Sequence, residues 1–160
     1  LKSRKQVSRQ FVPIRQSSPK IGEQIYAIGF PLSNLLGKSP KVTSGIISAL
    51  SGLGGDVSKV QVDAALQSGN SGGPIVDTKG RLVAVSVQKL GKAALAFLKD
   101  SGEIPENVNF GIKNLTVKTM LNAHKVRYSS DNIGDLNATI DSTVHITCWT
   151  DGAKPTTPNI

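Results

Sequence analysis

Short apolar runs separated by turn-forming residues are the feature that most restricts what this chain folds into. Seven such runs, each bounded by Gly, Pro, Ser, Asn or Asp, follow one another at close intervals: Phe11–Arg15, Gln24–Phe30, Val42–Leu50, Lys59–Asp63, Pro74–Asp77, Arg81–Gln88 and Val108–Ile112. Around Ile25 and Val85 the aliphatic residues alternate with period two, as in a strand with one buried face. Many short strands joined by turns predict an antiparallel sandwich or barrel.

Two segments have helical character instead. The residues Lys92–Asp100 predict a short helix inserted in a connection, and Leu115–His124 predict a second helix capped by Asn114. Beyond residue 128 the composition is polar and acidic until Thr143–Trp149, which is a candidate for a last strand. The sequence therefore predicts a mainly β fold with one or two short helices.

The basic excess of the chain is confined to its first 128 residues. Residues 1–128 hold 18 Lys and Arg against 7 Asp and Glu, whereas residues 129–160 hold 1 against 4. Such an excess is most often a solvated surface, and less often a site for nucleic acid or an anionic membrane. Nucleic acid is the weaker interpretation because only the charge supports it.

The composition also bears on whether the chain forms a disulfide or spans a membrane. Cys148 is the only cysteine, which excludes a disulfide within the chain. No apolar stretch approaches the roughly 20 residues that cross a bilayer, so no membrane-spanning segment is expected. No residue pattern indicates a metal site or a cofactor. The opening Leu-Lys-Ser-Arg-Lys has neither Met nor an apolar leader, and we interpret the chain as a fragment.

The segment Gly69-Asn70-Ser71-Gly72-Gly73-Pro74 carries the clearest chemistry. A serine hydroxyl attacks an acyl carbon when a base takes its proton and hydrogen-bond donors stabilise the oxyanion. Glycines on both sides of Ser71 permit backbone angles that turn neighbouring N–H groups toward one point. The backbone N–H groups of Gly69 and Ser71, with Asn70 in the loop between them, are therefore candidates for an oxyanion hole.

The same motif resembles the nucleophile turn of trypsin- and chymotrypsin-like serine proteases. Asn70 stands where digestive members have Asp, and this form is similar to the HtrA/Deg-like bacterial branch. Further matches occur in that family's order over about residues 11–125: Ile21–Leu32, Val42–Leu50, Gln61–Leu66 and Asn107–Lys113. The resemblance is specific, because these features and the serine turn appear in register.

The resemblance implies a fold of two six-stranded antiparallel β-barrels, of which this chain is the second, carboxy-terminal one. Residues 1–20 would be a connector from a missing first barrel, 21–127 the second barrel and 128–160 a divergent extension. The catalytic His and Asp are then expected from the absent upstream barrel. We assign no role to His124 or His145, and we expect the isolated chain to be inactive, since losing the base costs about a millionfold in kcat.

The resemblance also implies substrate contacts. Ala65 would lie at the base of the primary specificity pocket, with Leu66 beside it as a second substrate-binding residue. The absence of a carboxylate there favours a small or medium aliphatic residue at the cleavage position. Val85-Ser86-Val87 would be the edge that pairs with an extended substrate. Asp63 would support the nucleophile loop. A periplasmic or secreted location is implied in the same way.

Three functions remain open from the sequence. The first is a serine endopeptidase that hydrolyses protein or peptide substrates through an acyl-enzyme on Ser71. The second is a protease-like binding module without activity, and the third is a basic nucleic-acid or membrane-surface binder. The intact turn around Ser71 favours the first.

Overall fold

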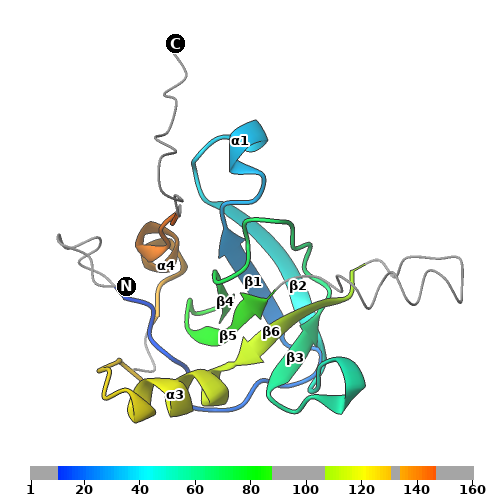
Figure 1. Cartoon of the computed structure of the whole chain (residues 1–160), viewed down its shortest axis with the longest axis vertical. Helices are drawn as coiled ribbons and strands as arrows, with labels where there is room; N and C mark the ends of the chain where they lie inside the picture. Colours follow the sequence, from blue (N-terminus) through cyan, green and yellow to red (C-terminus); the bar gives the residue numbers. More distant parts are fainter. Residues whose placement is uncertain (1–10, 88–106, 131–133, 147–160) are drawn as a thin grey trace, which may run out of the picture.

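Six antiparallel strands pair in a closed ring, as the sequence predicted. The computed structural model describes residues 11–87, 107–130 and 134–146, which are drawn in colour in Figure 1. The strands are β1 (Gln24–Gly29), β2 (Lys41–Ala49), β3 (Lys59–Val62), β4 (Pro74–Asp77), β5 (Leu82–Val87) and β6 (Asn109–Lys113). Their order is β1-β2-β3-β6-β5-β4, and β4 pairs back onto β1. Closure leaves each of these strands with a neighbour on both sides.

Alternate side chains of the strands fill the inside of the barrel. In β3, Val60 and Val62 are buried while Lys59 and Gln61 are partly exposed, as the two-residue period of a strand requires. The core cluster is formed by Ile25, Ala27, Ile47, Val60, Val62, Ala64, Leu66, Ile75, Val83 and Ala84. Because Ala64 and Leu66 follow β3, the chain that leads to Ser71 starts from inside the core.

The second predicted helix is present as α3 (Asn114–Ala123), but its expected cap is not. The Asn114 side chain is 1% exposed, and its amide donates to the carbonyls of Arg15 (2.7 Å) and Ser17 (3.0 Å). The prediction of Asn114 as a capping residue was therefore wrong: its amide holds the segment that leads into the barrel.

Other helices are too short to leave a periodic signal in the sequence. They are α1 (Ser33–Leu36), the 3-10 turn η1 (Leu53–Gly55) and α4 (Leu136–Ser142). The helix expected over Lys92–Asp100 lies outside the described residues. Residues 143–146 form no strand, and the rest of the expected last strand also lies outside. None of the helices in the described part of the chain is long and apolar enough to span a bilayer.

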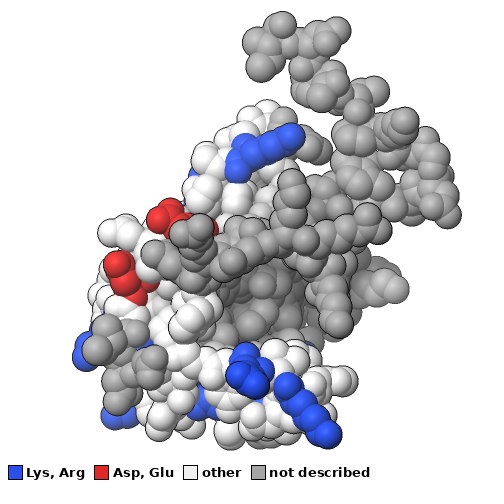
Figure 2. All heavy atoms as spheres, turned by 90° about the vertical axis from the view of Figure 1, so that its left-hand side faces the viewer, with Lys and Arg blue, Asp and Glu red and all other residues white. Residues whose placement is uncertain are grey.

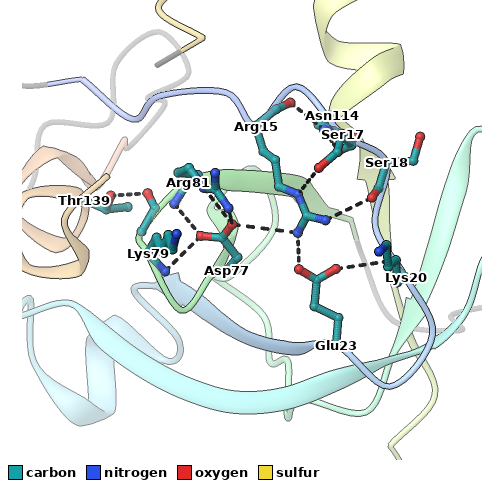
Figure 3. A network of polar contacts seen from close by, with 11 residues as sticks. Arg15, Ser17, Ser18, Lys20, Glu23, Asp77, Lys79, Arg81, Asn114 and Thr139 are labelled. Carbon is teal, nitrogen blue, oxygen red and sulfur yellow. Dashed lines mark hydrogen bonds and ion pairs between the residues drawn. The ribbon is translucent and has the colours of Figure 1, made fainter. Parts of the chain in front are cut away.

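The run Phe11–Arg15 forms a single parallel bridge, from Ile14 to Leu82, rather than a strand. Figure 3 shows what fixes this segment: Arg15 donates to Glu23 and lies 3.7 Å from the Asp77 carboxylate. Asp77 also binds Arg81 at 2.7 Å. The Arg15 and Asp77 side chains are only 7% and 4% exposed. Because buried charges are costly unless paired, this network ties the segment to β4.

The carboxy-terminal segment 134–146 packs on the turn between β4 and β5. The Thr139 hydroxyl donates to the Gly80 carbonyl (2.9 Å). Gly80 has φ +72°, and a Cβ there would lie 2.5 Å from the Asp135 carbonyl carbon. In Figure 1, α4 lies beside the β4–β5 end of the barrel. This docking brings residues 142–146 toward the loop that carries Ser71.

Candidate active site

Ser71 lies in an irregular loop built from two consecutive turns. The N–H of Asn70 donates to the Gln67 carbonyl (3.0 Å), and the N–H of Gly73 donates to the Asn70 carbonyl (2.9 Å). Asn70 is 4% exposed, whereas Ser71 is exposed. The loop begins at the buried Leu66 and ends where β4 starts. Its anchors are therefore in the core, while its hydroxyl faces outward.

Two glycines let this loop lie against the end of β1. Gly69 has φ +103°, and a Cβ at this position would lie 2.3 Å from the Phe30 carbonyl oxygen. A Cβ at Gly73 would lie 2.2 Å from the Ile28 carbonyl oxygen. The Phe30 N–H donates to the Gly69 carbonyl (3.3 Å). Only glycine permits both the positive φ and the close approach at residue 69.

Some backbone N–H groups of the loop donate hydrogen bonds within the protein, and others do not. Those of Asn70, Gly72 and Gly73 donate to carbonyls within 3.0 Å. Among the described residues, the N–H groups of Gly69 and Ser71 have no partner. Gly69 and Ser71 also line one cavity. Within the described part of the chain, the loop thus leaves one unpaired N–H donor on each side of Asn70, beside the exposed Ser71 hydroxyl.

Ser86 holds the loop from behind. Its hydroxyl donates to the Asn70 carbonyl and to the Gly73 carbonyl (3.1 Å), and its N–H also donates to Gly73 (2.9 Å). The Ser86 carbonyl accepts from the Gly72 N–H (2.8 Å). Ser86 was expected to pair with substrate, but both its backbone groups are used within the protein and its side chain is buried. Its position is that of a support for the nucleophile loop.

Three cavities surround the loop. The serine cavity, of about 480 Å³, is lined by Ser71, Gly69, Val85 and residues of the 142–146 segment. The loop cavity, of about 450 Å³, is lined by residues 66–71 and Val87. The leucine cavity, of about 270 Å³, lies between the loop and α1. Ser71 lines the first two, which places its hydroxyl between them.

Not all of the residues expected to determine specificity line a cavity in the structure. Leu66 lines the loop cavity and is 3% exposed. Ala65 is exposed and does not line it; its carbonyl accepts a hydrogen bond from the Thr43 hydroxyl (3.0 Å). Val85 and Val87 line the serine cavity and the loop cavity, respectively. The described lining of the loop cavity contains no charged side chain; Leu66 and Val87 are its apolar members, and Gln67, Ser68, Asn70 and Ser71 are polar.

Asp63 contacts a different element from the one expected. Its carboxylate accepts a hydrogen bond from the Ile46 N–H (2.6 Å), and a Cβ at Gly45 would lie 2.3 Å from the same oxygen. Asp63 therefore fastens the end of β3 to β2. The expectation that it holds the nucleophile loop was wrong, because the chain turns into the core at Ala64 before reaching that loop.

His145 is the residue near the site that sequence reasoning did not place there. Its ring packs on Phe30, with the centroids 5.3 Å apart, and both residues line the serine cavity. Within the described residues, no hydrogen bond joins the Ser71 hydroxyl to a histidine. His124 lies at the end of α3. The sequence around His145 carries no signal of this packing, which depends on how α4 docks.

Neither metal chemistry nor strongly shifted acids mark the site. The described residues hold no group of His, Cys, Asp and Glu that could bind a metal ion. Hydrogen bonds from Ser58 and Lys59 lower the pKa of Asp56 to about 2, and burial lowers the pKa of Lys118. Neither residue lines the serine, loop or leucine cavity.

Comparison with known proteins agrees with this geometry. The family described as trypsin-like peptidase domain matches residues 2–85, more than half of the chain and the whole nucleophile loop. The chain belongs to the trypsin-like peptidase family. This confirms the family resemblance, and curated relatives also carry the names DegS and Do-like HtrA.

The alignments with individual relatives include only part of this chain and a smaller part of each relative. The chain is 40% identical over 102 residues to the uncharacterized protein y4bJ of Sinorhizobium fredii, covering 64% of the chain and 16% of that protein. It is 36% identical over 121 residues to the periplasmic serine endoprotease DegP of Salmonella typhimurium, covering 73% and 22%. The serine endoprotease of Yersinia pestis superposes with a TM-score of 0.52 at 31% identity, covering 70% of this chain and 34% of that one. The chain thus spans about a third or less of these proteins.

Proposed function

We propose that the protein containing this chain is a serine endopeptidase that acts through an acyl-enzyme on Ser71. The observation that carries the proposal is the pair of free N–H groups, at Gly69 and Ser71, beside the exposed hydroxyl. Both donors are fixed by a loop anchored in the core and by Ser86. Membership of the trypsin-like peptidase family supports the same reaction.

In this reaction the Ser71 oxygen attacks the carbonyl carbon of the scissile peptide bond. A histidine of the proposed upstream barrel takes the hydroxyl proton, and the Gly69 and Ser71 N–H groups bind the oxyanion of the tetrahedral intermediate. The proton then passes to the leaving amine as the C–N bond breaks. Water, activated by the same base, hydrolyses the ester and restores Ser71. Protein or peptide segments are the proposed substrates.

The loop cavity is the proposed site for the substrate residue that precedes the scissile bond. Leu66 and Val87 contribute apolar side chains to its lining next to Ser71, beside the polar residues of the loop. We expect a small or medium aliphatic side chain here, because the described residues of the lining include no carboxylate to pair with Lys or Arg. Ala65, which sequence reasoning placed at its base, contributes only through the position of its neighbour Leu66.

The domain assignment and the location of the protein belong to the same proposal. We propose that residues 1–20 connect to an upstream barrel, that 21–127 form the second barrel and that 128–160 are an extension. A periplasmic or secreted location is proposed because the relative DegP is named as periplasmic. Fractionation of cells expressing the tagged full-length protein tests this location, and recovery in the cytoplasmic fraction would contradict it.

The other functions have less support. The described Lys and Arg side chains on the face in Figure 2 lie in separate places rather than in one patch, which does not favour a nucleic-acid site. A binding module without activity would not need two unused donors beside the serine hydroxyl. Labelling of the full-length protein with a fluorophosphonate probe distinguishes the enzyme from this module. We expect labelling that Ser71→Ala abolishes; absence of labelling in the wild type would favour the binding module.

A further inference from the structure

Three exposed leucines lie beside the nucleophile loop with no described partner to cover them. Leu32, Leu35 and Leu36 are 44%, 79% and 50% exposed, and they belong to α1 or to its cap. The helix has four residues, and no side chain caps its amino end. Adjacent exposed apolar side chains next to a cavity are typical of a binding surface.

The nucleophile loop itself fixes the position of these leucines. Leu32 has φ 48° and ψ 44°, a left-handed conformation that non-glycine residues rarely adopt. Its N–H donates to the Ser68 carbonyl (3.0 Å), and its carbonyl accepts from the N–H groups of Leu35 and Leu36 (2.8 Å each). Strained residues held in this way are common at ligand sites. The turn is therefore built onto the loop that precedes Ser71.

The leucine cavity lies next to the other two cavities and shares lining residues with both. Leu32 and Leu35 line it together with Phe30, Ser68 and Gly69. Ser68 and Gly69 also line the loop cavity, and Phe30 and Gly69 also line the serine cavity. The Ser68–Gly69 segment thus separates the loop cavity from the leucine cavity. If the Gly69 N–H binds the carbonyl oxygen of the scissile peptide bond, the loop cavity lies on one side of that bond and the leucine cavity on the other.

We propose that the leucine cavity binds an apolar side chain on the leaving-group side of the scissile bond, with Leu35 as a specificity-determining residue. The proposal rests on the proposed endopeptidase function, which assigns the loop cavity to the residue before the bond. The occupant is the substrate rather than a separate partner, because the leucine cavity shares Phe30, Gly69 and His145 with the serine cavity, which Ser71 lines. Leu35 is the most exposed of the three leucines, and its side chain is the one that a substrate would cover.

The test measures cleavage by the full-length protein of peptides that vary only in the residue after the scissile bond. We expect kcat/KM for leucine at this position to exceed that for serine by about tenfold, the discrimination that an apolar subsite provides. Leu35→Ser should reduce this ratio to within about twofold. Leu53→Ser is the matched control, because Leu53 is 60% exposed and lines none of the three cavities.

Leu35→Lys is a second variant, designed to create a new substrate preference. A new preference cannot result from loss of folding. A lysine at this position should raise kcat/KM for a peptide with aspartate after the scissile bond relative to one with leucine. Fluorophosphonate labelling needs no residue on the leaving side of the bond, and it should proceed at the wild-type rate in the Leu53→Ser control.

The outcomes separate the two proposals. No labelling of the wild type would overturn the endopeptidase function. Normal labelling with no preference at the leaving-side position, or with a preference that Leu35→Ser and Leu35→Lys leave unchanged, would overturn the role of Leu35 alone. The same holds if Leu53→Ser alters the preference as much as Leu35→Ser does.

Discussion

The Ser86 hydroxyl donates to the backbone carbonyl of Asn70, the residue immediately before Ser71. This hydrogen bond joins strand β5 of the barrel to the nucleophile loop. Since Ser86 is 1% exposed, the bond is shielded from water. It explains why a residue without access to substrate still determines how the loop is placed.

Removing this hydroxyl should slow the chemistry more than it lowers stability. The Asn70 carbonyl also accepts from the Gly73 N–H, so Ser86→Ala leaves it paired and should cost only about 1 kcal/mol of unfolding free energy. We expect fluorophosphonate labelling of Ser71 in the full-length protein to slow about tenfold or more, because the loop donors lose their support. Ser86→Thr, which retains a hydroxyl, should recover part of the rate. Labelling of Ser86→Ala at the wild-type rate would contradict a support role.

Gly69 is expected to tolerate no side chain. Alanine there would place a Cβ 2.3 Å from the Phe30 carbonyl oxygen at φ +103°, so the turn must rearrange and its N–H must move. We predict at least a hundredfold slower labelling, the cost of losing one oxyanion donor. Gly54→Ala is the control for backbone strain alone, since Gly54 has φ +66° with nothing within 4 Å of its Cβ. Equal rates in the two variants would show that the close approach has no effect on the site.

The buried ion network should be a major contributor to stability. Asp77 is 3% exposed and accepts from the Lys79 and Arg81 backbone N–H groups (3.0 Å each) and from the Arg81 side chain (2.8 Å). Asp77→Ala leaves Arg81 and Arg15 without this partner and should lower the unfolding free energy by about 3–5 kcal/mol in denaturant titration. Asp56→Ala, which removes a partly exposed pair with Lys59, should have a much smaller effect. A similar loss in both variants would contradict the role of burial.

The dependence of folding stability on pH in the acid range provides a separate test at Asp56. Hydrogen bonds from the Ser58 side chain, then Lys59, lower the folded-state pKa of Asp56 to about 2 from its ordinary 3.8. The stabilisation from this group is thus present above its ordinary pKa and is lost as the pH falls through about 2. NMR titration of the carboxyl should give the lowered pKa, and Ser58→Ala should raise it. An Asp56 pKa of 3.8 in the wild type would refute the predicted effect of these bonds.

The sequence predicted most of the barrel because period-two runs bounded by turn residues are local signals. Six of the seven runs are strands, whereas Phe11–Arg15 is not, because its backbone pairs with Leu82 only at Ile14. The Ser71 turn was recognisable because glycine and serine spacing is also local. The roles of Asn114, Asp63 and Ser86 were not, since each depends on which distant carbonyl or N–H group the fold brings near. The position of α1 beside the loop and the packing of His145 on Phe30 were missed for the same reason.

The central claim is that the Gly69 and Ser71 N–H groups converge on one anionic oxygen. A crystal structure of the full-length protein with a fluorophosphonate bound to Ser71 tests it directly. We predict a phosphoryl oxygen at about 2.7–3.1 Å from both backbone nitrogens. An adduct whose oxygen contacts neither nitrogen, or only one of them, would contradict it.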